Sequence, residues 1–484
     1  MPNQTLSKYN VSAVSSISID PSRSIHQHAS WSKVAPFIQD RKQITPKSNP
    51  NPKAGDVLTF EIDKDADFNS FVDLRFELPS LNPTTDPSGD DKFFIDTNHN
   101  AAVDGIPCNP GRNDLTLSTY AQGNGSGRLP DPNPTNQVIA TPNPCWADYV
   151  GFLMIKKLML KQSTNQVQTF TGRDLLYWHL KFHNLETREH YRQMTGGWDN
   201  GPLDPTGEVA KAQTWREFCV PLDLLFWVGK IDKQLPVVGT SRPLQIVIEL
   251  EDPEYLYLTT KTNLSPVQIP LRNCYIENHM THVLKNERAE ILQQLDSRHG
   301  LTWKNLDIES QEDNNLTFQQ NRTKGQIAIN GLKSALTTLF MTKIHSLDKK
   351  TKYATYWTNF LRINSYEMKS GKDEIIFPTN HFYDQIRLSN LYNNSAISNY
   401  HIYVHNWSVI PDDKFNCWNH LEIGNAFNPV LFVEYAANHK IGTSYNQSTG
   451  SPVENDTNAH LFDIVALYHQ FVQFKSGAID KITS

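Results

Sequence analysis

The sequence is poor in cysteine and lacks a long hydrophobic run. Its five cysteines among 484 residues are scattered, odd in number and never spaced as Cys-x-x-Cys. Such a set excludes a disulfide framework and favours a reducing compartment. No stretch of about 18 apolar residues occurs, and the N-terminal MPNQTLSKYNVSAVSS lacks the apolar core of a signal peptide. We therefore expect neither a membrane-spanning helix nor export through a conventional signal.

Positive charge is also scarce. The formal net charge is −6 at pH 7 and the pI is near 6.3, so the body of the protein does not suit nucleic acid and sequence-specific binding to it is not expected. The exception is a polar arm, residues 1–54, whose first 50 residues hold six Lys or Arg against two Asp. Such an arm can touch a polyanion or an acidic membrane, but a solvated or lattice-contacting tail is the simpler interpretation.

The familiar catalytic motifs are missing. The sequence contains no Gly-x-Ser-x-Gly elbow, no P-loop and no GxGxxG after a strand. Acidic pairs such as Glu251-Asp252 and Asp412-Asp413 stand at the ends of expected strands, where solvated turn residues are common. We therefore expect no enzymatic activity and no cofactor.

Alternation of apolar and polar residues is what the sequence does have, and it predicts β-strands. In FVDLRFELPSL (71–81), Val72, Leu74, Phe76 and Leu78 alternate with more polar neighbours. Further strands are expected in 57–64, 149–162, 215–229, 244–252 and 273–292. Residues 82–147 are dense in Pro, Gly, Asn and Asp, which predicts a long surface excursion with a role of its own, or partial disorder.

One helix and a second set of strands complete the pattern. Apolar residues and histidines recur at spacings of three and four in 172–197, which ends in Gly-Gly and predicts a helix. Short apolar runs then follow in 326–344, 381–392, 399–410, 428–436 and 460–474. The change between halves falls near 285–310, and no residue-level repeat is detectable. We expect a mainly β protein with two β-sandwiches in tandem.

Two histidine clusters invite a zinc interpretation. His401, His405, Cys417 and His420 fall within 20 residues, but the surrounding Tyr, Val, Trp and Ile predict a strand, which would separate the two histidines by about 13 Å. One zinc ion cannot accept both.

The second cluster, His179, His183 and Glu186, would share a helical face. However, Leu180 stands where the zinc-protease motif requires Glu, so we interpret both histidines as residues at the edge of the core.

A calcium loop is the remaining metal candidate. DTNHNAAVDG places oxygen-bearing side chains at Asp96, Asn98 and Asn100. An EF-hand would need Gly at position 101 and Glu at 107, where this chain has Ala101 and Pro107. Turn-forming Asx chemistry explains the stretch adequately, and the three residues stay weak candidates for a metal site.

Several stretches, taken in order, resemble the major capsid proteins of double jelly-roll DNA viruses, both the nucleocytoplasmic large DNA viruses and their smaller relatives. In the first half these are FVDLRFELPSL, YVGFLMIKKLMLKQSTNQVQTFTGRDLLYWHL, WREFCVPLDLLFWVGKIDKQLPVVGTSRPLQIVIEL and CYIENHMTHVLKNERAEI. In the second half they are IYVHNWSVIPDD and VALYHQFVQFKSGAIDKITS. Their order and spacing, over roughly residues 55–480, carry the resemblance. The chain departs from the family after Pro411, where it has KFNCWNHLEI, and in its long 82–147 segment.

The resemblance implies a double jelly roll: a first roll over 55–288, with the 82–147 loop and a helix near 172–195, and a second over 289–484. It implies a homotrimeric, pseudo-hexagonal capsomer that tiles the icosahedral shell of a double-stranded DNA virus and is assembled inside the host cell. Expected partners are further copies of the chain, neighbouring capsomers, minor capsid and penton proteins, and an internal membrane or host receptor. The family offers no catalytic residues.

Two other classes of protein remain open at this point. Jelly rolls with aromatic-rich loops also serve lectins, so a carbohydrate-binding β-sandwich is one alternative; it would be a monomer or dimer that binds glycans through exposed Trp or Tyr. A metal-dependent hydrolase is the other, and it would carry stoichiometric zinc.

Overall fold

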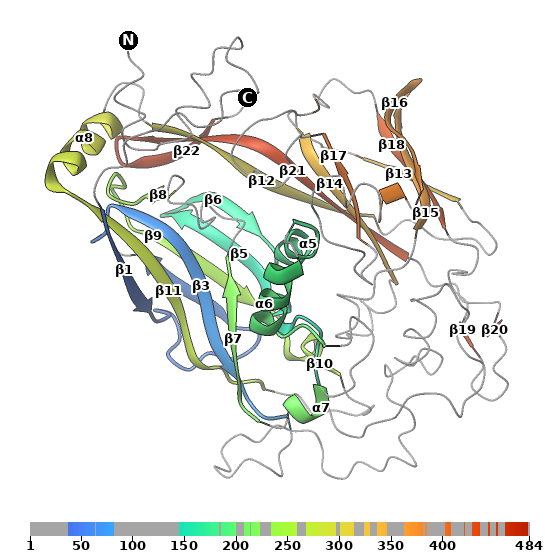
Figure 1. The fold of residues 1–484 in the computed structure, drawn as a ribbon, viewed down its shortest axis with the longest axis horizontal. Coiled ribbons are helices and arrows are strands. Elements are labelled where there is room, and N and C mark those ends of the chain that lie inside the picture. Colours follow the sequence, from blue (N-terminus) through green and yellow to red (C-terminus); the bar gives the residue numbers. More distant parts are fainter. Residues whose placement is uncertain are drawn as a thin grey trace.

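The computed structural model contains two β-sheet bodies that lie side by side along the long axis, with a group of helices between them (Figure 1). The described residues are 37–62, 64–81, 145–182, 185–199, 208–212, 214–222, 234–258, 268–296, 301–313, 324–329, 336–345, 363–380, 383–384, 402–407, 421, 428–435, 444–445, 452–453 and 460–482.

The first body consists of two antiparallel sheets, each with four main strands. One has the order β1-β11-β3-β7 and the other β2-β9-β5-β6. Their bounds are β1 (Phe37–Ile44), β2 (Val57–Ile62), β3 (Phe68–Leu78), β5 (Ile155–Gln162), β6 (Asn165–Phe170), β7 (Arg216–Pro221), β9 (Leu244–Leu250) and β11 (Arg272–Val283). Three short strands lie at the margins: β8 (Leu235–Pro236), which pairs with β3, and β4 (Cys145–Trp146), which pairs with β10 (Tyr257–Leu258).

The second body repeats this arrangement. Its sheets have the orders β12-β21-β14-β17 and β13-β18-β15-β16. Their bounds are β12 (Leu301–Asp313), β13 (Lys324–Ala328), β14 (Leu336–His345), β15 (Ile363–Ser370), β16 (Asp373–Asn380), β17 (Tyr403–Asn406), β18 (Pro429–Tyr435) and β21 (His460–Lys475). β22 (Ala478–Ile482) pairs with β21, and β19 (Ser444–Tyr445) pairs with β20 (Pro452–Val453).

The strand order is the same in the two bodies. If the eight main strands of each are counted along the chain, the first pairs with the eighth, the eighth with the third and the third with the sixth. In the facing sheet the second pairs with the seventh, the seventh with the fourth and the fourth with the fifth. This crossing of eight strands between two sheets is a jelly roll. The expectation of a mainly β chain with two tandem jelly rolls is therefore confirmed.

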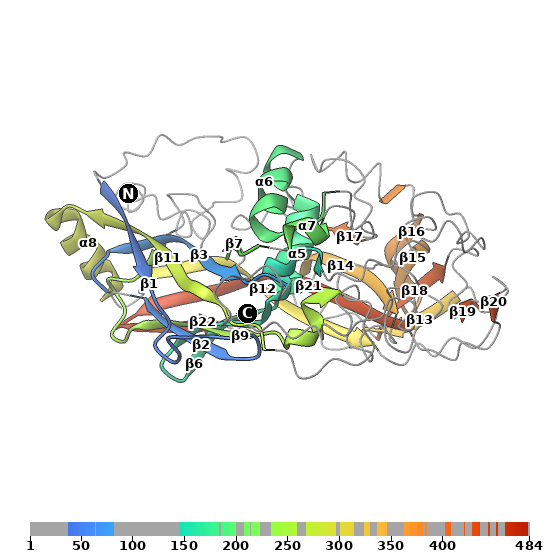
Figure 2. The same ribbon diagram turned by 90° about the horizontal axis from the view of Figure 1, so that it is seen from below.

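Three of the five α-helices in the described ranges belong to an insert between β6 and β7, and they gather on one side of the sheets (Figure 2). They are α5 (Gly172–Phe182), α6 (Leu185–Thr195) and α7 (Glu208–Lys211), with α4 (Val150–Leu153) packed beside them. The single helix predicted over 172–197 is wrong in extent, since the structure has two. The strand predicted over 149–162 begins instead with α4. One 3-10 turn, η5, spans Pro253–Tyr255.

Helix α8 (Lys285–Leu295) connects the two rolls, and the boundary expected between residues 288 and 289 falls within it. That division of the chain stays a prediction. No helix in the described ranges is long and apolar enough to cross a bilayer. Residues 1–36 of the basic arm and residues 82–144 of the long segment lie outside the described ranges.

Burial alternates along the strands in the way that the alternation of apolar and polar residues predicted. In β3, Val72, Leu74, Phe76 and Leu78 are all buried, and the residues between them are half-buried. The same strand pairs with β11 and β7, so one face of the sheet lines the core. The period-two pattern of FVDLRFELPSL thus reports a real inward face.

Strand β21 serves two cores at once. Every residue from Phe462 to Tyr468 is buried. One face of this segment contributes to the core of the second roll: Phe462, Ile464, Ala466 and Tyr468. The opposite face, with Val465 and Leu467, belongs to the same cluster as the core of the first roll. This sheet of the second roll is therefore buried on both faces, and one of the two faces packs against the first roll.

Candidate functional site: the helical insert and the junction of the rolls

Helix α5 lies at the junction of the two rolls, between its own sheets and strands β14 and β21 (Figure 1). Its apolar residues, including Leu175, Leu176 and Leu180, are buried in the first core. Arg173, Tyr177 and Lys181 follow one another at intervals of four, which places them on one face of the helix. This polar stripe is directed toward charged residues of the second roll.

Asp463 of β21 is the centre of the contact. The Arg173 Nη1 atom lies 2.7 Å from Asp463 Oδ2, and the Tyr177 hydroxyl donates to the same oxygen at 2.8 Å. Thr342 of β14 hydrogen-bonds the Tyr177 hydroxyl at 2.9 Å. The Asp463 side chain is only 2% exposed, so its charge depends on these partners in place of water. Burial, with the Asp463 charge second, raises the pKa of Tyr177 well above its usual value.

The start of α5 carries a further buried carboxylate. Asp174 accepts from the Thr171 backbone N–H at 2.7 Å and from its hydroxyl at 2.9 Å. The Asp174 N–H donates back to the Thr171 hydroxyl, which completes a capping box. Burial raises the pKa of Asp174 to about 6, against the lowering effect of the Thr171 hydrogen bonds. Asp463 adds to the increase and Arg173 opposes it.

The stripe ends at Lys181, which is buried near Asp384, another buried carboxylate of the second roll. Burial lowers the pKa of Lys181 to about 8, and the charge of Asp384 opposes that shift. Asp384 also accepts from the Tyr366 hydroxyl at 2.6 Å and from the Val404 N–H at 3.2 Å. One helix of the first roll thus faces two buried carboxylates of the second.

The rolls are fastened at another place by the β21–β22 hairpin. The Gly477 carbonyl at its tip accepts from Gln162 Nε2 at 2.7 Å and from the Ser241 N–H at 2.8 Å. Gln162 in turn accepts from the Ile479 N–H at 2.9 Å. Ser476 and Gly477 have φ of 49° and 81°, as a two-residue hairpin turn of type I′ requires. The Ser-Gly in the resembling C-terminal stretch is this turn.

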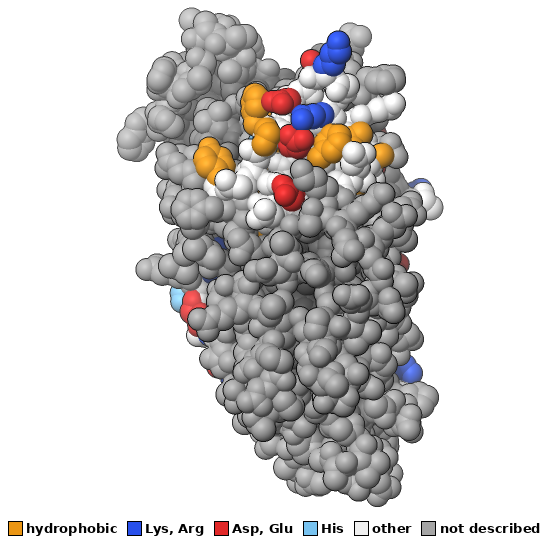
Figure 3. All heavy atoms as spheres, turned by 90° about the vertical axis from the view of Figure 1, so that its right-hand side faces the viewer, with side chains coloured by type: hydrophobic (Ala, Val, Ile, Leu, Met, Phe, Trp, Pro, Cys, Tyr) orange, Lys and Arg blue, Asp and Glu red, His pale blue; other side chains and the backbone are white. Residues whose placement is uncertain are grey.

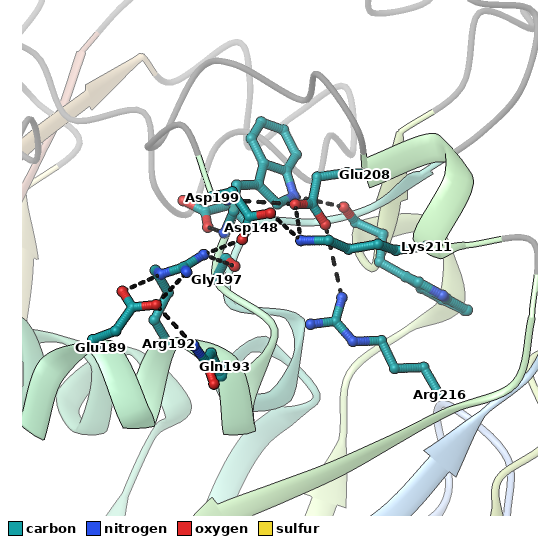
Figure 4. Close-up of polar contacts among 11 residues, drawn as sticks. Asp148, Glu189, Arg192, Gln193, Gly197, Asp199, Glu208, Lys211 and Arg216 are labelled. Atoms are coloured by element: carbon teal, nitrogen blue, oxygen red, sulfur yellow. Dashed lines mark hydrogen bonds and ion pairs between the residues drawn. The ribbon is translucent and has the colours of Figure 1, made fainter.

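A surface network of charges holds the insert in shape (Figure 4). Arg192 of α6 pairs with Glu189 one turn earlier and with Asp199 beyond the helix. Lys211 of α7 lies 2.6 Å from Asp199 and 2.8 Å from Glu208. Asp199 therefore connects the two helices. Its hydrogen bond from Lys211, followed by that from Arg192, lowers its pKa to about 2.

The backbone between the helices is fixed by tryptophans. Trp198 is 1% exposed; its N–H donates to Asp148 at 2.8 Å and its indole N–H to the Trp146 carbonyl at 3.0 Å. The charged residues in Figure 4 thus pair with one another, and the segment that carries them is attached to the core. This arrangement stabilises the insert and does not resemble a binding site.

We expect Asp199→Asn to lower the free energy of unfolding by about 1 kcal/mol or less, because the network is half-exposed and screened by water. Since the folded carboxylate has the lower pKa, its contribution is present above about pH 4 and is lost as the pH falls toward 2. Urea unfolding at neutral and acidic pH and in molar salt measures this. Asp480→Asn, at an exposed acid, is the control; an equal loss in both variants would contradict the role of the network.

Of the histidines in the two zinc hypotheses, the structure describes His179 and His405. His179 is 1% exposed and stacks on Tyr191 at 5.0 Å, while Glu186 belongs to the next helix, α6. His405 lies in β17 against Trp407, and burial lowers its pKa to about 4. Residues outside the described ranges are His183, His401, Cys417, His420, Asp96, Asn98 and Asn100. In the part of the chain that is described, no three His, Cys, Asp or Glu gather where they could hold a metal ion.

The junction residues escaped the sequence analysis, although two signals pointed to them. Arg173, Tyr177 and Lys181 have the spacing of four that places polar side chains on one face of a helix. Asp463 is the only charged residue in the otherwise apolar run FDIVAL. A lone carboxylate in such a run indicates a strand buried on both faces with a specific polar partner.

The architecture matches solved structures along nearly the whole chain. VP54 of PBCV-1, a crystal structure fitted into a cryo-EM reconstruction of the virophage Sputnik, superposes with a TM-score of 0.60 at 10% identity and covers 95% of this chain and 100% of its own. The Faustovirus major capsid protein gives 0.59 at 10% identity, with 93% and 92% covered. The chain has the double jelly-roll fold of viral capsid proteins.

A chain of the Sputnik virophage structure determined by cryo-EM is also similar, with a TM-score of 0.53 at 9% identity over 96% of this chain and 92% of its own. The resemblance stated from the sequence motifs is thereby confirmed at the level of the fold. No family model and no curated protein matches the sequence.

Proposed function

We propose that this chain is a major capsid protein, the building unit of a viral shell. The observation that carries the proposal is the eight-strand topology, which occurs twice in the part of the chain that the structure describes. The similar Faustovirus protein is a major capsid protein with both chains covered almost end to end. The function is structural, with assembly in place of catalysis, in the virion shell formed inside the host cell.

Three copies per capsomer is the arrangement that suits two rolls per chain. Six rolls then surround one axis, and a head-to-tail contact between the rolls of neighbouring copies closes into a ring. Edge strands such as β1 and β16 leave backbone groups unpaired within their own sheets, and burying them between copies removes a liability for aggregation. Neighbouring capsomers, minor capsid and penton proteins, and an internal membrane or host receptor are the further partners in this proposal.

The β15–β16 hairpin offers one candidate contact surface. Phe377 is 70% exposed and Tyr383 46%, and hydrophobic side chains gather among acidic and basic ones at this end of the molecule (Figure 3). Phe377 and Pro378 form a bulge, because both stand opposite the single residue Glu367. A proline and a bulge on an edge strand discourage strand addition. The surface therefore favours side-chain packing against a neighbour.

Replacing Phe377 with Asp is expected to weaken assembly while leaving the fold intact, since the side chain is exposed within one chain. Removing a buried aromatic anchor from an interface costs about 2 kcal/mol or more, roughly a thirtyfold loss in affinity. Sedimentation across a concentration series measures it, with Phe377→Leu as the apolar control. Normal assembly of the Asp variant would remove this surface from the interface.

The function itself is tested by the mass and shape of the purified protein. We expect a stable particle near three times 55.2 kDa, and shell-like or hexagonal arrays in electron micrographs. A strict monomer that binds glycans would favour the lectin alternative. A monomer with stoichiometric zinc, lost on chelation together with a hydrolytic activity, would favour the hydrolase. Either result would contradict the capsid assignment.

A further inference from the structure

The contact between the rolls combines two kinds of interaction. Apolar side chains of the second roll, among them Phe340, Val404 and Leu467, belong to the same cluster as the first core. Burial of apolar area stabilises the contact but is not directional. The polar contact at Asp463 is directional, because a hydrogen bond weakens steeply away from its preferred distance and angle.

The apolar contact alone permits more than one placement. On the face of β21 that meets α5, Asp463, Val465 and Leu467 follow one another at intervals of two. A displacement by two residues keeps the same face inward and replaces one aliphatic side chain by another. Among these three residues, Asp463 alone has hydrogen-bonded partners on α5 that distinguish the observed placement from the displaced one.

We propose that the contact of Arg173 and Tyr177 with Asp463 and Thr342 is a register lock, which selects a single placement of the second roll against α5. The four side chains come from three elements, α5, β14 and β21, and all are buried or nearly so: Arg173 is 11% exposed and Asp463 2%. A displaced sheet would take the Asp463 carboxylate away from the guanidinium and the phenol, inside a site closed to water. A buried carboxylate that loses such hydrogen bonds is disfavoured.

The lock and the hairpin tip have separate roles. The hairpin tip holds Gly477 to Gln162 and Ser241 through backbone carbonyl contacts that carry no net charge. If the register lock is removed and the hairpin tip is retained, the second roll stays attached at the tip but can move about that point. Buried polar groups have this selecting role in other settings, where replacing them by apolar residues keeps stability but loses a unique arrangement.

Two matched tyrosines provide the first test. Tyr177→Phe removes hydrogen bonds to Asp463 and Thr342, which cross the junction. Tyr403→Phe removes two hydrogen bonds of 2.8 Å, both to Ile363 within the second roll. Both variants should lower the unfolding midpoint. Only Tyr177→Phe should increase hydrogen exchange of the α5 and β14 amides and broaden the distance between spin labels at exposed Val57 and Ala328.

A triple variant, Arg173→Met with Tyr177→Phe and Asp463→Leu, tests the lock more severely. We expect it to fold with its stability maintained, because an apolar set replaces a buried ion pair. The single narrow distance between the labels should become several. A stable triple variant with one unchanged narrow distance would overturn the lock, as would equal broadening in Tyr177→Phe and Tyr403→Phe. If the triple variant fails to fold, the tyrosine pair alone decides.

Discussion

Gly172→Ala is expected to lower the free energy of unfolding by about 3 kcal/mol or more, the upper range for overpacking a core. A Cβ atom at Gly172 would lie 1.8 Å from the Phe152 carbonyl oxygen and 2.7 Å from that of Ile155. Both are backbone atoms that cannot rotate away, so α5 would have to move from α4. The polar stripe of α5 would move with it, which links this glycine to the junction of the rolls.

Urea unfolding measures the effect, and Gly371→Ala is the matched control. Gly371 has φ of +61° but nothing within 4 Å of its added Cβ, so only the left-handed backbone opposes alanine, at about 1 to 2 kcal/mol. A smaller loss for Gly172→Ala than for Gly371→Ala would show that the close approach of α4 and α5 is not required.

Asp174→Asn is expected to stabilise the protein at pH 8 by up to about 3 kcal/mol and to have little effect near pH 4. The folded carboxyl has a pKa of about 6 against an ordinary 3.8, so the folded state holds its proton more tightly than the unfolded chain. The stability it contributes is complete below about pH 4 and is lost as the pH rises through 6. Asparagine keeps an oxygen that accepts from Thr171 and removes the charge that faces Asp463.

The measurement is the unfolding free energy of both proteins from pH 4 to 8. Asp174→Leu serves as the control, because it also removes the charge but abolishes the capping box, which costs about 1 kcal/mol. A difference between Asn variant and parent that does not change with pH would contradict the buried, proton-holding carboxyl.

The strands were the predictable part of this fold, and the reason is local. The period of two in FVDLRFELPSL and LQIVIEL depends only on one face of each strand pointing into the core, so it is visible in the sequence itself. The division of the 172–197 helix and the short α4 could not be read, since their ends depend on tertiary packing such as the close contact of Gly172 with Phe152.

The junction was harder for another physical reason. Arg173 and Asp463 are separated by 290 residues, and nothing in either neighbourhood specifies the other. The zinc and calcium hypotheses considered from the sequence concerned residues close to one another along the chain, where spacing can be argued. A contact between distant segments becomes visible only once the topology brings β21 against α5.

The position of β21 also sets an order of events during synthesis. Val472 and Phe474, together with Ile479 of β22, complete the core of the first roll, yet they leave the ribosome long after β11, the last main strand of that roll. Until β21 and β22 are made, this part of the first core has no cover. Domains made first usually fold first; for this chain we expect instead that truncations ending before β21 expose that apolar surface and aggregate.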